Sequence, residues 1–220
     1  MMQAWTEQFI AEAIRCEALR FGEFVLKSGR QSPYFFNVGQ FSSGRSLCVL
    51  SHCYRQALQA SGIACDMLFG PAYKGIPLAA AMACAVHEHD QRDLPYAYDR
   101  KEAKQHGEGG TLVGAPISGG VVIIDDVISA GTSARYSAAA IRQAGGRVAA
   151  LLVALDRQER GQTADISAST ELEQAGIPVI AIATLSDVIA YLDVHQGESI
   201  NINSALHKAV AKYQQSWGTT

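Results

Sequence analysis

The sequence predicts an α/β fold with a central, mostly parallel sheet flanked by helices. Residues 121–124 are four consecutive apolar β-branched residues, a run typical of a strand that is covered on both faces. From residue 65 onward, short apolar runs alternate with segments of helical spacing, which is the rhythm of βαβ units. The chain has 220 residues, enough for one sizeable hydrophobic core. We therefore expect a single domain over residues 1–220, with at most a small appended piece.

Composition narrows the classes of partner. The net charge is −3, so no overall basic field would attract nucleic acid or an anionic membrane. The sequence has neither a basic and then apolar leader nor an apolar run of membrane-spanning length, so we expect no signal peptide and no membrane contact. Five cysteines without a C-x-x-C spacing indicate reduced, mostly buried thiols in a cytoplasmic protein.

The N-terminal part of the chain is predicted to contain two helices separated by a hairpin. Apolar residues at helical spacing over residues 5–14 predict a first helix whose apolar stripe packs on the core. Apolar segments at residues 24–26 and 34–36 flank a polar turn, which predicts a hairpin and a candidate lid. The spacing over residues 43–60 predicts a second helix, which ends at Ser61-Gly62.

The first βα unit carries a candidate anion-binding lysine. A short strand is expected at residues 65–69 and an alanine-rich helix at residues 76–86. The loop between them, GPAYKG, lies at the carboxyl end of a strand, where ligands bind in open α/β sheets. Lys74 precedes a glycine and a helix start, so its ammonium group is well placed to meet an anion. The alternative is an exposed lysine in a turn.

A charged, glycine-rich loop follows the next predicted strand, which spans residues 95–98. Residues 99–110 have almost no apolar side chains, so they should pack poorly and move. Glycines able to act as hinges lie beside four potential cations, which indicates a lid that closes on an anionic ligand. The four are Arg100, Lys101, Lys104 and His106. The alternative is an ordinary solvated loop.

The stretch from residue 121 to residue 133, VVIIDDVISAGTS, predicts a site for a phosphorylated sugar. Its strand ends in Asp125 and Asp126, and small residues then lead into a helix predicted over residues 134–144. Backbone N–H groups at such a helix start form an anion cradle, although the lysine of an ATP-binding P-loop is missing. Two acids beside a phosphate require other partners, such as ribose hydroxyls or a hydrated Mg²⁺. The alternative is a solvated acid pair before a capped helix.

The last third of the chain adds a candidate arginine. A strand predicted over residues 147–155 ends in Asp156-Arg157, so the guanidinium of Arg157 should lie near the same crevice. Its rigid donor fork suits a planar carboxylate or imide, and the alternative is a surface arginine. The remaining predicted elements are a helix at 169–175, a strand at 179–184, a helix at 185–191 and a terminal helix at 203–215.

Three motifs together resemble the type I phosphoribosyltransferases, and most specifically the bacterial orotate phosphoribosyltransferases. They are VVIIDDVISAGTS, GPAYKG and YDRKEAKQHGEGG, and the resemblance covers most of the chain. It implies the type I phosphoribosyltransferase fold, with a hood formed by about residues 1–40 over the base site. It also implies transfer of the 5-phosphoribosyl group from phosphoribosyl pyrophosphate (PRPP) to orotate, giving orotidine 5′-monophosphate and pyrophosphate in UMP biosynthesis.

The resemblance assigns roles residue by residue. It implies catalytic roles for Lys74, Lys104, Asp125 and Asp126. It implies PRPP contacts by Lys27, Tyr73, Lys74, Arg100, Lys101, Lys104, His106, Asp125, Asp126, Val127, Ile128, Ser129, Ala130, Gly131, Thr132 and Ser133. It implies orotate contacts by Phe35, Phe36, Ser129 and Arg157. Position 129 is commonly threonine in this family, and serine keeps the hydroxyl donor.

The same resemblance implies a cofactor and a partner. Mg²⁺ would be held by PRPP oxygens and water, with Asp125 and Asp126 in its outer shell. A homodimer would form, in which the loop over residues 100–110 completes the partner's site. Two rival functions remain: a phosphoribosyltransferase for another base, such as a purine, and a regulator that binds PRPP as an effector and contacts nucleic acid. The net charge and the intact lysine loop argue against the regulator.

Overall fold

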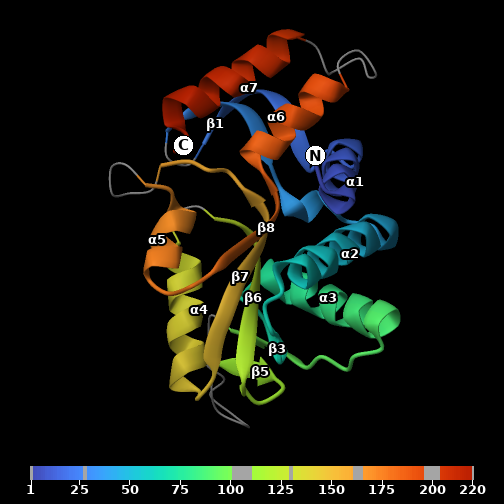
Figure 1. Ribbon diagram of the computed structural model, residues 1–220, viewed down its shortest axis with the longest axis vertical. Helices are drawn as coiled ribbons and strands as arrows, with labels where there is room; N and C mark the ends of the chain where they lie inside the picture. The colour runs from blue at the N-terminus through green and yellow to red at the C-terminus, as the bar shows by residue number, and fades with distance from the viewer. Residues whose placement is uncertain are drawn as a thin grey trace.

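The computed structural model describes residues 2–26, 29–100, 111–128, 131–160, 166–195 and 204–219 (Figure 1). Its helices are α1 (Ala4–Arg15), α2 (Gly44–Ser61), α3 (Gly75–Asp90), α4 (Thr132–Gln143), α5 (Ala168–Gln174), α6 (Leu185–Val194) and α7 (Ser204–Trp217). Its strands are β1 (Leu19–Val25), β2 (Gln31–Phe36), β3 (Met67–Gly70), β4 (Tyr96–Asp99), β5 (Leu112–Gly114), β6 (Gly120–Val127), β7 (Arg147–Asp156) and β8 (Val179–Thr184). A short 3-10 helix spans Val38–Gln40.

Six strands form the central sheet in the order β5-β4-β3-β6-β7-β8. The pairs β4–β3, β3–β6, β6–β7 and β7–β8 are parallel, and only β5 at one edge pairs antiparallel with its neighbour, β4, within the described residues. The predicted mostly parallel sheet is confirmed. Because β6 lies between β3 and β7, the carboxyl ends of all three strands meet at one edge of the sheet.

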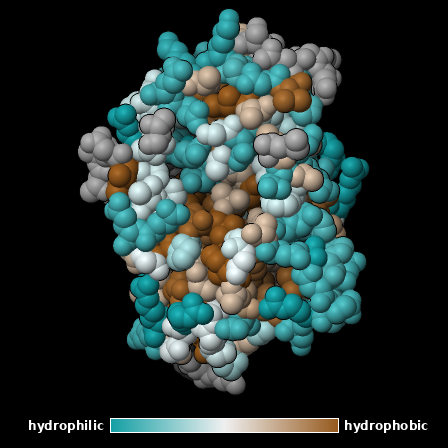
Figure 2. Space-filling view, in the orientation of Figure 1, coloured by the Kyte–Doolittle hydropathy of each residue, from teal (hydrophilic) through white to brown (hydrophobic). Residues whose placement is uncertain are grey.

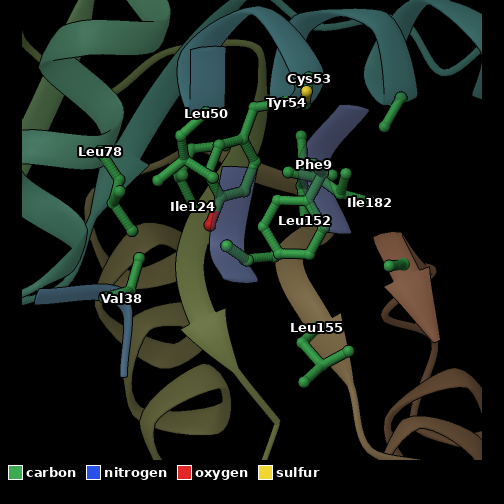
Figure 3. Packing of buried hydrophobic residues seen from close by; sticks show 14 of the residues in the cluster. Phe9, Val38, Leu50, Cys53, Tyr54, Leu78, Ile124, Leu152, Leu155 and Ile182 are labelled. Carbon is green, nitrogen blue, oxygen red and sulfur yellow. The ribbon is translucent and has the colours of Figure 1, made fainter. Parts of the chain in front are cut away.

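Strand β6 is buried on both faces, as its apolar run predicts. Val122 and Ile124 pack into a cluster with α1, α2 and α3, whereas Val121 and Ile123 pack into a second cluster with α4 and α5. In Figure 1, α2 and α3 accordingly lie on one side of the sheet and α4 and α5 on the other. Figure 3 shows Tyr54 of α2 reaching onto Ile124, so the core fixes β6 just before its acidic end.

The predicted N-terminal hairpin is present, and its strands are longer than expected. β1 and β2 are antiparallel, with Leu19 opposite Phe36. The hairpin packs against α7 and α1, and both ends of the chain lie in the upper part of Figure 1. Figure 2 shows hydrophobic residues gathered in the middle of the same view, over the β7 and β8 side of the sheet.

Three other features differ from expectation or extend it. β5 was not predicted, and α3 continues four residues past its predicted end to Asp90. The cysteines are free thiols, but "mostly buried" was wrong: only Cys53 and Cys65 are buried, since Cys48 and Cys84 are exposed and Cys16 is intermediate. Within the described ranges, no helix is both long enough and apolar enough to cross a bilayer.

Candidate active site

Glycines at both ends of the loop between β3 and α3, Gly70 and Gly75, allow a close approach of backbones, and Gly75 lies against β6. A Cβ on Gly70 would lie 2.2 Å from the carbonyl oxygen of Gly75. A Cβ on Gly75 would lie 2.5 Å from Cδ of Pro71 and 2.7 Å from the carbonyl oxygen of Ile124. Only glycine permits backbones to approach this closely. The loop therefore reaches β6 immediately before the acid pair.

This close approach brings Lys74 onto the acid pair. Lys74 Nζ donates to Asp126 Oδ2 at 2.6 Å. The lysine side chain is 54% exposed and the Asp126 side chain is 11% exposed, so the ion pair is open to solvent on the lysine side. The neighbouring backbone is held from the other side, since the N–H of Ala72 donates to Asp99 Oδ1 at 2.6 Å. Two motifs 52 residues apart thus form one charged site.

The carboxylate of Asp125 accepts hydrogen bonds from its neighbours and pairs with no cation among the described residues. Its Oδ1 accepts from the N–H of Asp126 at 2.9 Å, and its Oδ2 accepts from the hydroxyl of Ser133 at 3.2 Å. Its backbone carbonyl accepts from the buried hydroxyl of Tyr54 at 2.7 Å. Burial, followed by the charge of Asp126, raises the pKa of Asp125 to about 6. A ligand that brings positive charge or hydroxyl donors would favour its ionised form.

The start of α4 lies where the sequence predicts an anion cradle. The helix begins at Thr132, two residues earlier than expected, after Gly131 with φ of 68°. No side chain among the described residues caps this end, and both Thr132 and Ser133 are exposed. The first-turn N–H groups and the helix dipole are therefore available to an anion at this end. Ser133 also connects the cradle to Asp125.

Arg157 lies at the carboxyl end of β7 in a cluster that the sequence did not predict. Its Nε donates to the hydroxyl of Tyr34 at 3.0 Å, and its guanidinium forms an ion pair with Glu159 at 2.6 Å. Its side chain is 20% exposed. Tyr34 belongs to β2, so this cluster joins the hairpin to the sheet. The only sequence signal for this cluster was an acid, Glu159, two residues after Arg157. It indicated neither Tyr34 nor the contact between the hairpin and the sheet.

Phe35 and Phe36 do not form one surface, because successive residues of a strand point to opposite faces. The ring of Phe36 lies 6.0 Å from that of Phe9 in α1 and packs against the core. The ring of Phe35 lies 5.6 Å from that of Phe24 on the other side of the hairpin. Arg20 lies over both Phe24 and Phe35, at 5.7 Å from each ring centroid.

The other sequence-predicted residues divide into described and undescribed positions. Tyr73 is 66% exposed on the β3–α3 loop, and the N–H of Arg100 donates to the carbonyl of Thr111 at 2.7 Å. Val127 is half-buried and Ile128 is buried beneath the cradle. Six predicted residues lie outside the described ranges: Lys27, Lys101, Lys104, His106, Ser129 and Ala130.

Comparison with known proteins identifies close relatives. The model of the phosphoribosyl transferase domain family matches residues 49–184. The orotate phosphoribosyltransferase of Saccharophagus degradans is 54% identical over 218 residues, which cover 99% of each chain. That of Cronobacter sakazakii is 51% identical over 218 residues, covering 99% of this chain and 100% of the relative. A crystal structure of orotate phosphoribosyltransferase from Francisella tularensis matches with a TM-score of 0.84 and 38% identity, covering 96% of this chain and 99% of that one.

Proposed function

The chain belongs to the orotate phosphoribosyltransferases of the phosphoribosyltransferase family, and we infer that it transfers the 5-phosphoribosyl group from PRPP to orotate. The products are orotidine 5′-monophosphate and pyrophosphate, and the reaction belongs to pyrimidine biosynthesis. The single observation in the structure that carries this assignment is the meeting of the GPAYKG loop and the acidic end of β6, through the 2.6 Å contact between Lys74 and Asp126.

Each part of this site suits one chemical group of PRPP. The uncapped start of α4 suits the 5′-phosphate, which requires N–H donors and a favourable dipole. Asp125 and Asp126 suit the ribose hydroxyls, because carboxylates accept hydrogen bonds from them. Lys74, more than half exposed, suits the pyrophosphate. We assign the remaining PRPP contacts to Tyr73, Arg100 and the β6–α4 loop. By family resemblance, we also assign PRPP contacts to Lys27, Lys101, Lys104 and His106.

Catalysis would consist mainly of charge stabilisation. The ring nitrogen of orotate displaces pyrophosphate at ribose C1, and positive charge develops on the sugar while the leaving pyrophosphate gains negative charge. Lys74 and Lys104 would stabilise the leaving group, and the acid pair would hold the ribose beside it. Pyrophosphate would compete with Asp126 for the ammonium of Lys74, so substrate binding would free this carboxylate for the sugar.

Mg²⁺ fits this site as an ion that binds with the substrate. Among the described residues, no cluster of three or more metal-ligating side chains exists. Asp125 and Asp126 are carboxylates suited to hydrogen-bonding the ion's water shell. The Mg²⁺ would neutralise charge on the pyrophosphate. Asp125, whose pKa is about 6, would be held ionised by that positive charge.

The base site would lie beneath the N-terminal residues. We propose that about residues 1–40 form a hood and that Arg157, Phe35, Phe36 and Ser129 contact orotate. The cationic side chain of Arg157, 20% exposed, supports this role, because orotate carries a carboxylate. Since Phe36 packs against Phe9, its contribution would come from its backbone and ring edge.

Two further proposals concern assembly and location. We propose a homodimer in which residues 100–110 of one protomer complete the site of its partner, since Lys104 belongs to that loop in the family pattern. We also propose that the enzyme acts in the cytoplasm, where its five free thiols would remain reduced.

The test of function is an assay of base consumption. Purified protein with PRPP and Mg²⁺ should consume orotate, measured as loss of its ultraviolet absorbance, and should leave adenine, hypoxanthine and uracil unchanged. Omission of PRPP is the control. Consumption of a purine but not orotate would overturn the assignment, and turnover of no base would favour the regulatory alternative.

A further inference from the structure

We propose that Tyr34, held by Glu159 and Tyr213, is a positioning residue that orients Arg157 toward the orotate carboxylate. Helix α7, which supplies Tyr213, would then belong to the apparatus that recognises the base. This inference rests on the proposed contact between Arg157 and orotate. The resemblance assigned no role to Tyr34, Glu159 or Tyr213.

Tyr34 fixes the guanidinium of Arg157 in two ways. Its hydroxyl accepts from Nε of Arg157 at 3.0 Å, and Cζ of Arg157 lies 5.1 Å from the centroid of its ring. Tyr34 itself is fully buried, with 0% of its surface exposed. A planar guanidinium that is held at Nε and stacked on a ring has one orientation. Because Nη2 pairs with Glu159, Nη1 is the terminal nitrogen left for a carboxylate among the described contacts, and its fixed position lowers the entropic cost of binding one.

Glu159 holds Tyr34 in place and connects it to α7. The Tyr34 hydroxyl donates to Oε1 of Glu159 at 3.4 Å, and the Tyr213 hydroxyl donates to the same oxygen at 2.9 Å. The Tyr34 and Tyr213 rings also meet edge to face, with centroids 5.8 Å apart. The segment after β7 is tied to the end of α7 by its backbone, since the N–H of Arg160 donates to the carbonyl of Trp217 at 2.9 Å.

The charges of the cluster suit a monoanion. Arg157 and Arg30 both pair with Glu159, at 2.6 and 3.3 Å, so two positive charges and one negative charge leave one net positive charge. The tyrosines stay neutral donors at physiological pH, because burial raises the pKa of Tyr213 to about 12 and that of Tyr34 further. Replacing Tyr34 with phenylalanine leaves this net charge unchanged. The substitution therefore isolates orientation from charge.

A purely structural role would give a different result. If the cluster only docked the hairpin on the sheet, loss of the Tyr34 hydroxyl would impair both substrates alike or simply lower stability. If it orients Arg157, the loss should fall on orotate alone and should require Arg157 to be present. A double-mutant cycle separates the two.

The experiment measures KM for orotate and for PRPP in Tyr34→Phe, Arg157→Ala and the double variant. Loss of one hydrogen bond to a charged group predicts a rise in orotate KM of roughly tenfold for Tyr34→Phe, with PRPP KM within about twofold. In the Arg157→Ala background, Tyr34→Phe should add less than about twofold. Equal effects in both backgrounds would overturn the positioning role. An unchanged orotate KM in Arg157→Ala would instead overturn the proposed contact on which it rests.

Tyr213→Phe is a second, milder test of the same cluster. It removes one hydrogen-bond donor to Glu159 and alters no direct contact of Arg157 or of the base. It should raise orotate KM by about threefold with PRPP KM unchanged. Tyr96→Phe is the matched control, because Tyr96 lies on β4, separated from β7 by β3 and β6. It should leave both KM values unchanged. If Tyr34→Phe does not fold and Tyr213→Phe leaves orotate KM at the wild-type value, the inference is wrong.

Discussion

Asp125 is a carboxylate held where its negative charge costs free energy. Its pKa is about 6 in the folded protein against 3.8 for an ordinary aspartate, so the folded state binds the proton more tightly. Relative to high pH, protonation of Asp125 stabilises the folded state. This stabilisation is complete below about pH 4 and is lost as the pH rises through 6. At pH 7.5 the wild-type protein should carry a penalty of at most roughly 3 kcal/mol from this one group.

Asp125→Asn should remove that penalty. The amide keeps an acceptor for the N–H of Asp126, so we expect the variant to unfold at higher urea concentration than wild type at pH 7.5, with little difference at pH 4. Asp93→Asn, at an exposed position, is the control and should change neither value. A variant that is no more stable than wild type at pH 7.5 would contradict the raised pKa.

At the scale of single residues, the sequence predicted the chemistry of the ligand better than it predicted which residues contact one another. An acid pair followed by a small-residue helix start was enough to predict a phosphorylated sugar with ribose hydroxyls. That Lys74 pairs with Asp126 depends on how closely two loops approach, which no spacing within either motif encodes. Tyr34 was overlooked for the same reason, since its partner is 123 residues away.

At the scale of elements, the β3–α3 loop is positioned by glycines rather than by apolar burial. Gly75→Ala would place a methyl group 2.5 Å from Pro71 and 2.7 Å from the carbonyl of Ile124, so the loop must move away from β6. We expect a loss of about 2 kcal/mol in unfolding free energy, measured in urea, as for other overpacked sites. Because Lys74 would move with the loop, PRPP KM should rise about tenfold or more.

Gly44→Ala is the matched control for this prediction. Gly44 is in the first turn of α2, and a Cβ there would meet nothing within 4 Å. Alanine should be neutral or stabilise the helix by up to about 1 kcal/mol, with PRPP KM unchanged. If Gly75→Ala behaves like Gly44→Ala in both measurements, close packing of the loop does not position Lys74.

Elements with a long periodic pattern were predictable, and short edge elements were not. The helix expected over residues 43–60 is α2, Gly44–Ser61, because its N-cap serine and terminal glycine both leave sequence signals. β5 has three residues, too few for any alternation, and it forms only by pairing with β4. The hairpin strands exceed their predicted lengths because polar residues such as Arg20, which is exposed and lies opposite Phe35, continue the pairing.

At the scale of the whole molecule, two cations of the described site are already paired with acids. Lys74 is paired with Asp126, and Arg157 with Glu159. PRPP is strongly anionic, so additional positive charge is required when it binds. By family resemblance, we expect Lys101 to supply that charge together with Lys104 from a second subunit. Such a composite site makes activity a property of the pair, which subunit mixing can test.

We expect Lys104→Ala to lower kcat by roughly a hundredfold, and an Asp125→Asn/Asp126→Asn double variant to be equally impaired. If the sites are shared, exchange of subunits between the two variants gives heterodimers with one site intact and one doubly defective. Random exchange makes half of the dimers heterodimers, so about a quarter of wild-type activity should return. Each variant incubated alone is the control. No recovery, once native mass spectrometry has detected heterodimers, would assign Lys104 and the acid pair of each site to a single chain.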